Sequence, residues 1–138
     1  MSEQNKAVTK RVFDEGWNAR NLAVCDEVFT ATHVSHDPST GDTPPGPAGL
    51  KGVISTYTGA FPDLKMTVND ILAEGDRVVV RWTAVGTNTG TMMGMPPTGK
   101  TSTVTGMLVN RFENGKIAES WGVWDKAGML QQLGLMPS

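Results

Sequence analysis

The hydrophobic periodicity of this sequence changes once, near residue 62, and that change constrains the fold more than any other feature. Before it, apolar residues such as Leu50, Ile54 and Tyr57 recur three and four positions apart, which is typical of a helix with one apolar face. After it, the pattern favours long strands, at residues 64–72, 77–87, 101–113 and 116–125. Helices followed by a run of antiparallel strands predict an α+β domain whose helices pack on one face of a curved sheet and enclose a pocket there.

Turn and breaker residues mark the limits of the predicted elements. A short extended segment at 32–37 leads into a proline-rich loop at 38–47, and Pro62 ends the helix that precedes it. The dipeptide Asn114-Gly115 separates the last two strands and is the strongest short hairpin signal. The predicted helices cover residues 2–17, 22–29, 50–61 and 126–133.

Length and charge exclude several classes of protein. With 138 residues, the chain fits one domain, residues 1–138. Twelve basic and fourteen acidic residues give a net charge of −2 and no basic patch, so we expect neither nucleic-acid nor membrane binding. The sequence offers no apolar run of about 20 residues and no metal-ligand spacing. A lone Cys25 cannot form an internal disulfide, which favours a cytoplasmic location.

A set of ordered motifs spans nearly the whole chain. In sequence order they are His36-Asp37-Pro38, Ala60-Phe61-Pro62-Asp63-Leu64, Gly86-Thr87-Asn88-Thr89-Gly90, Gly94-Met95-Pro96-Pro97-Thr98-Gly99-Lys100, Arg111-Phe112-Glu113-Asn114-Gly115-Lys116-Ile117, Glu119-Ser120-Trp121 with Asp125, and Leu130-Gln131-Gln132-Leu133-Gly134. Together they resemble the SnoaL-like polyketide cyclase family.

The resemblance implies a nuclear transport factor 2-like fold, a cone in which three or four helices pack on a strongly curved, mostly antiparallel sheet. Members are usually dimers that pair through the sheet. The cyclases of the family close a ring by intramolecular aldol condensation without metal or cofactor, and other members hydroxylate aromatic polyketides. We therefore expect no cofactor and no metal here.

The family's catalytic positions are altered in this chain. The resemblance places the general acid/base Asp of the cyclases at Gly122, on the last strand. Their His falls on Leu108, and their Asn, just before the proline of the early strand, falls on Asp37. We therefore expect the proton-transfer groups to be other ionisable residues, which lie at the ends of strands near the pocket.

Asp125 is the first candidate, at the junction of the last strand and the final helix. As a carboxylate beside Trp121 and Trp124, it would lose hydration and suit proton transfer. The alternative role is to cap the helix that begins at Lys126, since Asp is a preferred N-cap residue. Without a bulge, Asp125 shares a strand face with Trp121, whereas Trp124 shares the face of Gly122.

The adjacent pair His36 and Asp37 gives two further catalytic candidates. On a strand they point to opposite faces, so one of them reaches the pocket. The alternative is an Asx-type turn, in which one of them bonds the backbone near Pro38. His33 is interpreted as a bystander.

Substrate-binding residues are expected among the aromatic and strand residues of the pocket. The expected residues are Trp17, Tyr57, Arg81, Leu108, Trp121 and Trp124. Arg81 and Arg111 either bind a substrate carboxylate or lie on a solvent or dimer face. The aromatic residues either line the pocket or pack in the core.

Three functions remain open from the sequence. The first is an enzyme that uses general acid/base chemistry on an apolar cyclic or polyketide-like carbonyl compound, by aldol cyclisation or a related tailoring reaction such as hydroxylation. The second is a ketosteroid isomerase-like isomerase, for which Tyr57 is the only phenol. The third is a non-catalytic module that binds a small apolar molecule. Because Val78, Val79 and Val80 make both faces of one strand apolar, we also expect a homodimer.

Overall fold

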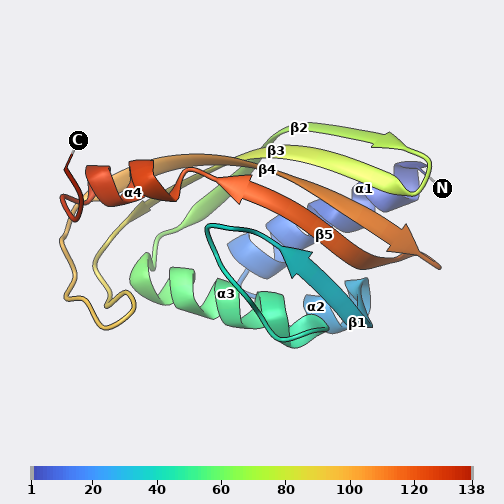
Figure 1. The fold of residues 1–138 in the computed structure, drawn as a ribbon, viewed down its shortest axis with the longest axis horizontal. Helices are drawn as coiled ribbons and strands as arrows, with labels where there is room; N and C mark the ends of the chain where they lie inside the picture. The colour runs from blue at the N-terminus through green and yellow to red at the C-terminus, as the bar shows by residue number, and fades with distance from the viewer. Residues whose placement is uncertain (1, 138) are drawn as a thin grey trace.

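The protein consists of helices packed against one face of a single curved sheet, as a computed structural model of residues 2–137 shows (Figure 1). Its elements, in chain order, are α1 (Ser2–Arg11), η1 (Val12–Asn18), α2 (Val24–Val28), β1 (Phe29–His36), α3 (Pro47–Ala60), β2 (Lys65–Glu74), β3 (Arg77–Thr87), β4 (Thr101–Glu113), β5 (Lys116–Trp124) and α4 (Lys126–Gln132). The predicted α+β class is confirmed.

The sheet has the strand order β1-β5-β4-β3-β2. Neighbouring strands are antiparallel except for β1, which pairs parallel with β5. The hairpin between β4 and β5 turns at Asn114 and Gly115, whose φ angles of 52° and 79° are those of the tight turn that the dipeptide favours. The hairpin predicted at this dipeptide is therefore confirmed, and β1 adds one parallel edge to a mostly antiparallel sheet.

The concave face of the sheet is covered by α1, η1 and α3, and most of the core lies between these layers (Figure 1). Helix α3 has Pro47 in its first turn, where a missing N–H costs nothing, and it ends at Ala60, before Pro62. At the other end of the sheet, α4 packs against β4 and closes a second part of the core, which includes Phe61, Val104 and Met129.

Two local details differ from the sequence-based expectation. The last turns of the first predicted helix form a π-helix, η1, whose wider turns place Val12, Phe13 and Gly16 in the core. A Cβ atom on Gly16 would lie 3.3 Å from a methyl group of Val24, so glycine permits the close approach. Strand β1 also begins earlier than expected, because Phe29 already pairs with Ile117.

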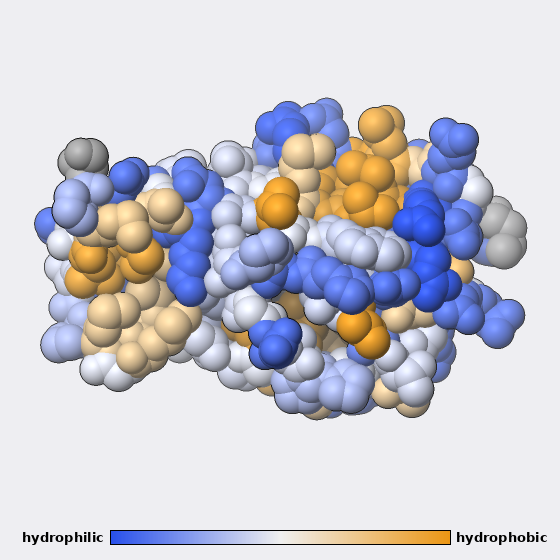
Figure 2. Space-filling view, in the orientation of Figure 1, coloured by the Kyte–Doolittle hydropathy of each residue, from blue (hydrophilic) through white to orange (hydrophobic). Residues whose placement is uncertain are grey.

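The convex face of the sheet carries exposed apolar side chains. They are Val34, Leu72, Val85, Met107 and Val123, each at least 40% exposed. Figure 2 shows apolar residues gathered over the upper part of the molecule, bordered by hydrophilic ones. Within residues 2–137, no helix is long and apolar enough to cross a membrane. The same residues contain no group of three side chains suited to hold a metal ion.

Candidate functional site

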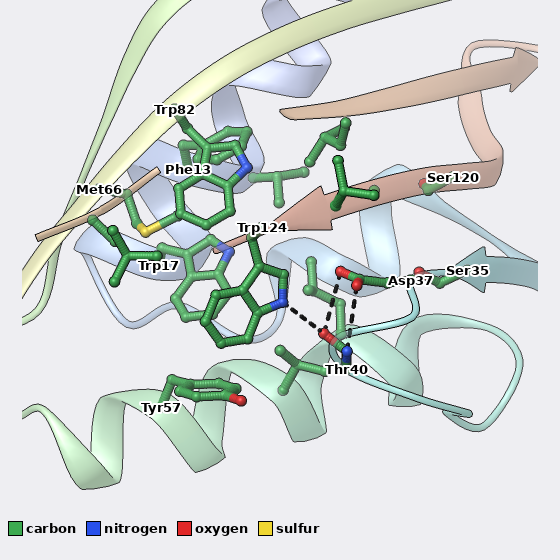
Figure 3. Close-up of a pocket in the computed structure, with 18 of the residues that line it drawn as sticks. Phe13, Trp17, Ser35, Asp37, Thr40, Tyr57, Met66, Trp82, Ser120 and Trp124 are labelled. Carbon is green, nitrogen blue, oxygen red and sulfur yellow. Dashed lines mark hydrogen bonds between the residues drawn. The ribbon is translucent and has the colours of Figure 1, made fainter. Parts of the chain in front are cut away.

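A cavity of about 180 Å³ lies between the helices and the concave face of the sheet. Its wall is mainly apolar and aromatic (Figure 3). The aromatic residues that line it include Phe13 and Trp17 from η1, Tyr57 from α3, Trp82 from β3 and Trp124 from β5. An apolar cavity with a few polar groups is the usual form of a small-molecule site. Here several of the polar side chains form two hydrogen-bonded clusters.

Asp37 forms the first cluster, at the end of β1, where its side chain lines the cavity (Figure 3). Its Oδ1 accepts hydrogen bonds from the backbone N–H groups of Ser39 (2.9 Å) and Thr40 (3.3 Å), and its Oδ2 accepts one from the Thr40 hydroxyl (3.2 Å). The Thr40 hydroxyl in turn accepts from the indole N–H of Trp124, at 3.2 Å. The turn after β1 therefore fixes a carboxylate among aromatic rings.

The carboxylate of Asp37 also lies next to Gly122 of β5. A Cβ atom built on Gly122 would be 3.5 Å from Oδ2 of Asp37, which is ordinary van der Waals contact. Gly122 is the position where the family resemblance places the acid/base Asp of the cyclases. In this chain, a carboxylate from the neighbouring strand occupies the space beside that position.

Tyr57 presents the only phenol of the chain to the same region of the cavity. Its ring packs edge-on against Trp124, with centroids 5.6 Å apart. Burial raises the pKa of Tyr57, and the negative charge of Asp37 raises it further. The hydroxyl therefore stays protonated at neutral pH and is a hydrogen-bond donor.

His33, Ser120, Asn110 and Thr9 form the second polar cluster, a chain of hydrogen bonds across the sheet. Nε2 of His33 lies 2.9 Å from Oγ of Ser120, which donates to Oδ1 of Asn110 at 2.7 Å. Nδ2 of Asn110 donates to the Thr9 hydroxyl at 3.3 Å. Burial lowers the pKa of His33 to about 4, so the ring is neutral at pH 7. The first three residues line the cavity.

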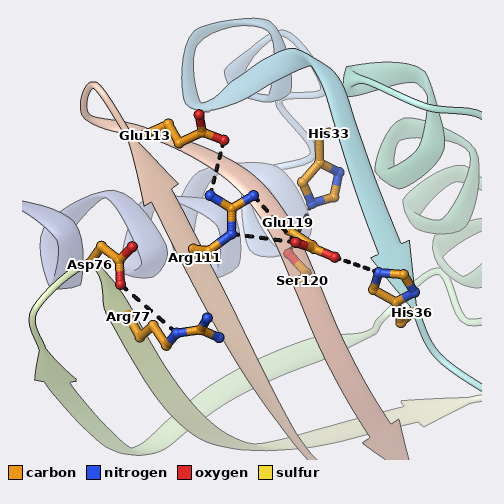
Figure 4. Close-up of polar contacts among 8 residues, drawn as sticks. All are labelled: His33, His36, Asp76, Arg77, Arg111, Glu113, Glu119 and Ser120. Carbon is orange, nitrogen blue, oxygen red and sulfur yellow. Dashed lines mark hydrogen bonds and ion pairs between the residues drawn. The ribbon is translucent and has the colours of Figure 1, made fainter.

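Several residues predicted for the site lie on the convex face instead, because their parity along the strand points them away from the cavity. His36 pairs with Glu119 at 2.8 Å (Figure 4). Its ring also stacks on Trp121. His36 and then Arg111 hold the pKa of Glu119 below its usual range. Arg81 pairs with Asp70 at 2.7 Å. The structure thus brings neither His36, Trp121 nor Arg81 to the cavity wall.

Asp125 takes the capping position at the start of α4. Its Oδ1 accepts a hydrogen bond from the backbone N–H of Gly128, at 2.8 Å, and the residue is exposed. It is not among the residues that line the cavity. Of the three predicted catalytic residues, the structure brings only Asp37 to the cavity.

The remaining predicted binding residues, Trp17, Tyr57, Leu108 and Trp124, do line the cavity. Sequence reasoning missed the second cluster, and in particular it treated His33 as a bystander. The signal was available: residues 33, 35 and 37 alternate on one face of a strand, so His33 and Asp37 belong to the same side.

Comparison with known proteins agrees with this architecture. The sequence model of the SnoaL-like polyketide cyclase family matches residues 7–133. A comparison with curated proteins gives no match. The cone of helices on a curved sheet with an interior cavity defines the structural class, and the match over nearly the whole chain defines the family: the chain belongs to the SnoaL-like polyketide cyclases.

Solved structures of similar proteins carry the same fold. AclR from Streptomyces galilaeus, a proposed hydroxylase, is 29% identical, with a TM-score of 0.86 over 100% of this chain and 89% of that one. IdmH from Streptomyces antibioticus, a proposed polyketide cyclase, is 35% identical, with a TM-score of 0.81 over 95% of this chain and 99% of that one. A proposed SnoaL-like polyketide cyclase from Jannaschia sp. CCS1 is 26% identical, with a TM-score of 0.87 over 99% and 95% of the two chains.

Proposed function

We propose that this protein is a cofactor-independent enzyme that removes a proton from the carbon next to a carbonyl group in an apolar cyclic or polyketide-like compound. The observation that carries the proposal is the Asp37 carboxylate, which is held by hydrogen bonds in a cavity with aromatic walls. In such surroundings, a fixed carboxylate meets a bound C–H group without competing water.

In the proposed reaction, Asp37 acts as the general base and Tyr57 as the hydrogen-bond donor. The carboxylate takes the proton from the α-carbon, and the electron pair of that C–H bond moves to the carbonyl oxygen, which becomes an enolate. The protonated phenol of Tyr57 donates a hydrogen bond to this oxygen as its charge develops. In an aldol cyclisation, the enolate carbon then attacks a second carbonyl of the same molecule, and the resulting alkoxide takes the proton back from Asp37.

The first step is tested with 1-tetralone, a cyclic ketone fused to an aromatic ring. Exchange of its α-protons for deuterium in D₂O is monitored by NMR. Wild-type protein should accelerate the exchange over buffer. Asp37→Asn should reduce this acceleration by about 10²–10⁴-fold, the usual effect of removing a general base. Asparagine keeps an oxygen for the N–H groups of Ser39 and Thr40, so the turn should stay intact.

Asp125→Asn is the matched control, because it changes the same functional group outside the cavity. We expect this variant to retain wild-type exchange. Retention of the full rate in Asp37→Asn, with unchanged thermal unfolding, would refute the role of Asp37.

A non-catalytic binding module is the second candidate function, and one observation favours it. Asp37 already accepts three hydrogen bonds from Ser39 and Thr40, as expected of a residue that stabilises the turn after Pro38. Under this alternative, 1-tetralone and larger aromatic ketones bind in the cavity but their α-protons exchange at the rate of the buffer.

We further propose that the convex face of the sheet pairs with a second copy of the chain. The supporting observation is that Leu72 and Val123, 69% and 61% exposed, lie on this face together with three other large apolar residues. Paired copies would cover these side chains, of which Met107 and Val123 also border the cavity.

A further inference from the structure

The mainly apolar wall of the cavity carries two hydrogen-bonded polar clusters, and the proposed function uses the first of them together with Tyr57. The second, formed by His33, Ser120 and Asn110, lies on β1, β5 and β4. His33 and Asn110 are each 5% exposed, whereas Ser120 is less buried and faces the cavity (Figure 3). Ser120 is therefore the member of this cluster that a bound molecule meets.

The protons of this cluster can be assigned from its geometry. Ser120 has one hydroxyl proton, which it donates to Asn110. The hydrogen in the contact between His33 and Ser120 must therefore come from Nε2 of the histidine. With one bond donated and one accepted, the serine oxygen retains a single unused lone pair. The group that completes this site is a hydrogen-bond donor, because only a donor can use the remaining lone pair. The mainly apolar wall favours a neutral donor over a charged one.

The position of the second cluster relative to Asp37 follows from strand geometry. Ser120 and Gly122 point to the same face of β5 and are two residues apart, which corresponds to roughly 7 Å. The carboxylate of Asp37 lies beside Gly122. A single aromatic ring system therefore spans the distance from the reacting carbon at Asp37 to the oxygen of Ser120.

We propose that Ser120, held by His33 and Asn110, binds a hydroxyl group of the substrate on the side of the ring system away from the carbonyl that Asp37 activates. This inference rests on the proposed function and narrows its substrate class to hydroxylated aromatic or cyclic ketones. Ser120 acts as a specificity-determining residue. It takes no part in the proton transfers.

The test compares two ligands that differ only at the proposed contact, 6-hydroxy-1-tetralone and 6-methyl-1-tetralone. Their dissociation constants are measured by calorimetry with wild-type protein, Ser120→Ala and Ser102→Ala. Wild-type protein should bind the hydroxyl compound about fivefold more tightly than the methyl compound, as one neutral hydrogen bond predicts. Ser120→Ala should lose this preference. Ser102→Ala should keep it, because Ser102 lines the cavity on β4 outside the cluster.

A second measurement follows ligand binding to the wild-type protein by NMR. The ¹⁵N and proton signals of the His33 ring should shift when the hydroxyl compound binds and shift less with the methyl compound. His36→Gln assigns the two histidines, since His36 lies on the convex face and pairs with Glu119. Equal affinities for the two ligands in wild-type protein, or an unchanged preference in Ser120→Ala, would overturn the proposal.

The binding ratio is independent of turnover, which separates this inference from the proposed function. Loss of exchange in Asp37→Asn together with an unchanged hydroxyl preference in Ser120→Ala supports the base and refutes the hydroxyl site. Full exchange in Asp37→Asn together with a lost preference in Ser120→Ala refutes the base and supports the hydroxyl site.

Discussion

Protonation of His33 should destabilise the fold as the pH falls, because its ring is buried. Burial is the main cause that lowers the pKa of His33 from 6.5 to about 4. The unfolded chain then binds this proton more tightly than the folded protein does. The free energy of unfolding is therefore fully retained above pH 6.5 and decreases as the pH falls from 6.5 towards 4. At 1.36 kcal/mol per pKa unit, the loss is about 2 kcal/mol at pH 5 and about 3 kcal/mol below pH 4.

Urea denaturation at pH 7.5 and pH 5.0 measures this loss. The free energy of unfolding should fall about 2 kcal/mol more in wild-type protein than in His33→Gln, whose side chain does not titrate. Carboxylates such as Glu119 titrate in both proteins, so their contribution largely cancels in the difference. An NMR titration of His33 with a midpoint near 6.5, or equal losses in wild type and His33→Gln, would refute the reasoning.

Three further perturbations test the fold and the assembly. Asp125→Ala should lower the free energy of unfolding by about 1 kcal/mol in urea, and Asp125→Asn by clearly less, because asparagine also caps helices; equal losses would contradict the capping role. Gly106→Ala should lower the free energy of unfolding by about 1–3 kcal/mol, because the new Cβ atom would lie 2.6 Å from Cε2 of Trp82. A variant that is as stable as wild type and binds ligand with unchanged affinity would contradict this packing. Val123→Lys should convert a dimer to a monomer in sedimentation at tens of micromolar protein, whereas a wild-type protein that is already monomeric there would refute pairing through the convex face.

The fold could be predicted because its strongest signals are local. Pro62 ends a helix, Asn114-Gly115 forms a tight turn, and both act within a few residues. The π-helical turns of η1 could not be foreseen, since a helix widens in this way only when packing against the sheet favours it. The early start of β1 likewise depends on a partner, Ile117, far away in the sequence.

The candidate site was only partly predictable, for a different reason. Alternation along a strand shows which residues share a face, but not which face the helices cover. That choice separates Asp37 from His36 and Trp124 from Trp121, and it is made by tertiary packing. Asp125 had two possible roles in the sequence, and its hydrogen bond to the N–H of Gly128 now accounts for one of them. The cluster around His33 joins three strands and a helix, so no single segment of the sequence contains it.

The proximity of Asp37 to Gly122 has a consequence for how relatives of this protein are compared. An alignment column records what a residue position contains, and at position 122 this chain shows glycine where the resemblance places a carboxylate. A reader of that column alone would classify the chain as inactive. The parallel pairing of β1 with β5 nevertheless brings a carboxylate from another column within 3.5 Å of the vacant Cβ position. A comparison by the positions of carboxylate groups in space would therefore place together proteins that a comparison by alignment column separates.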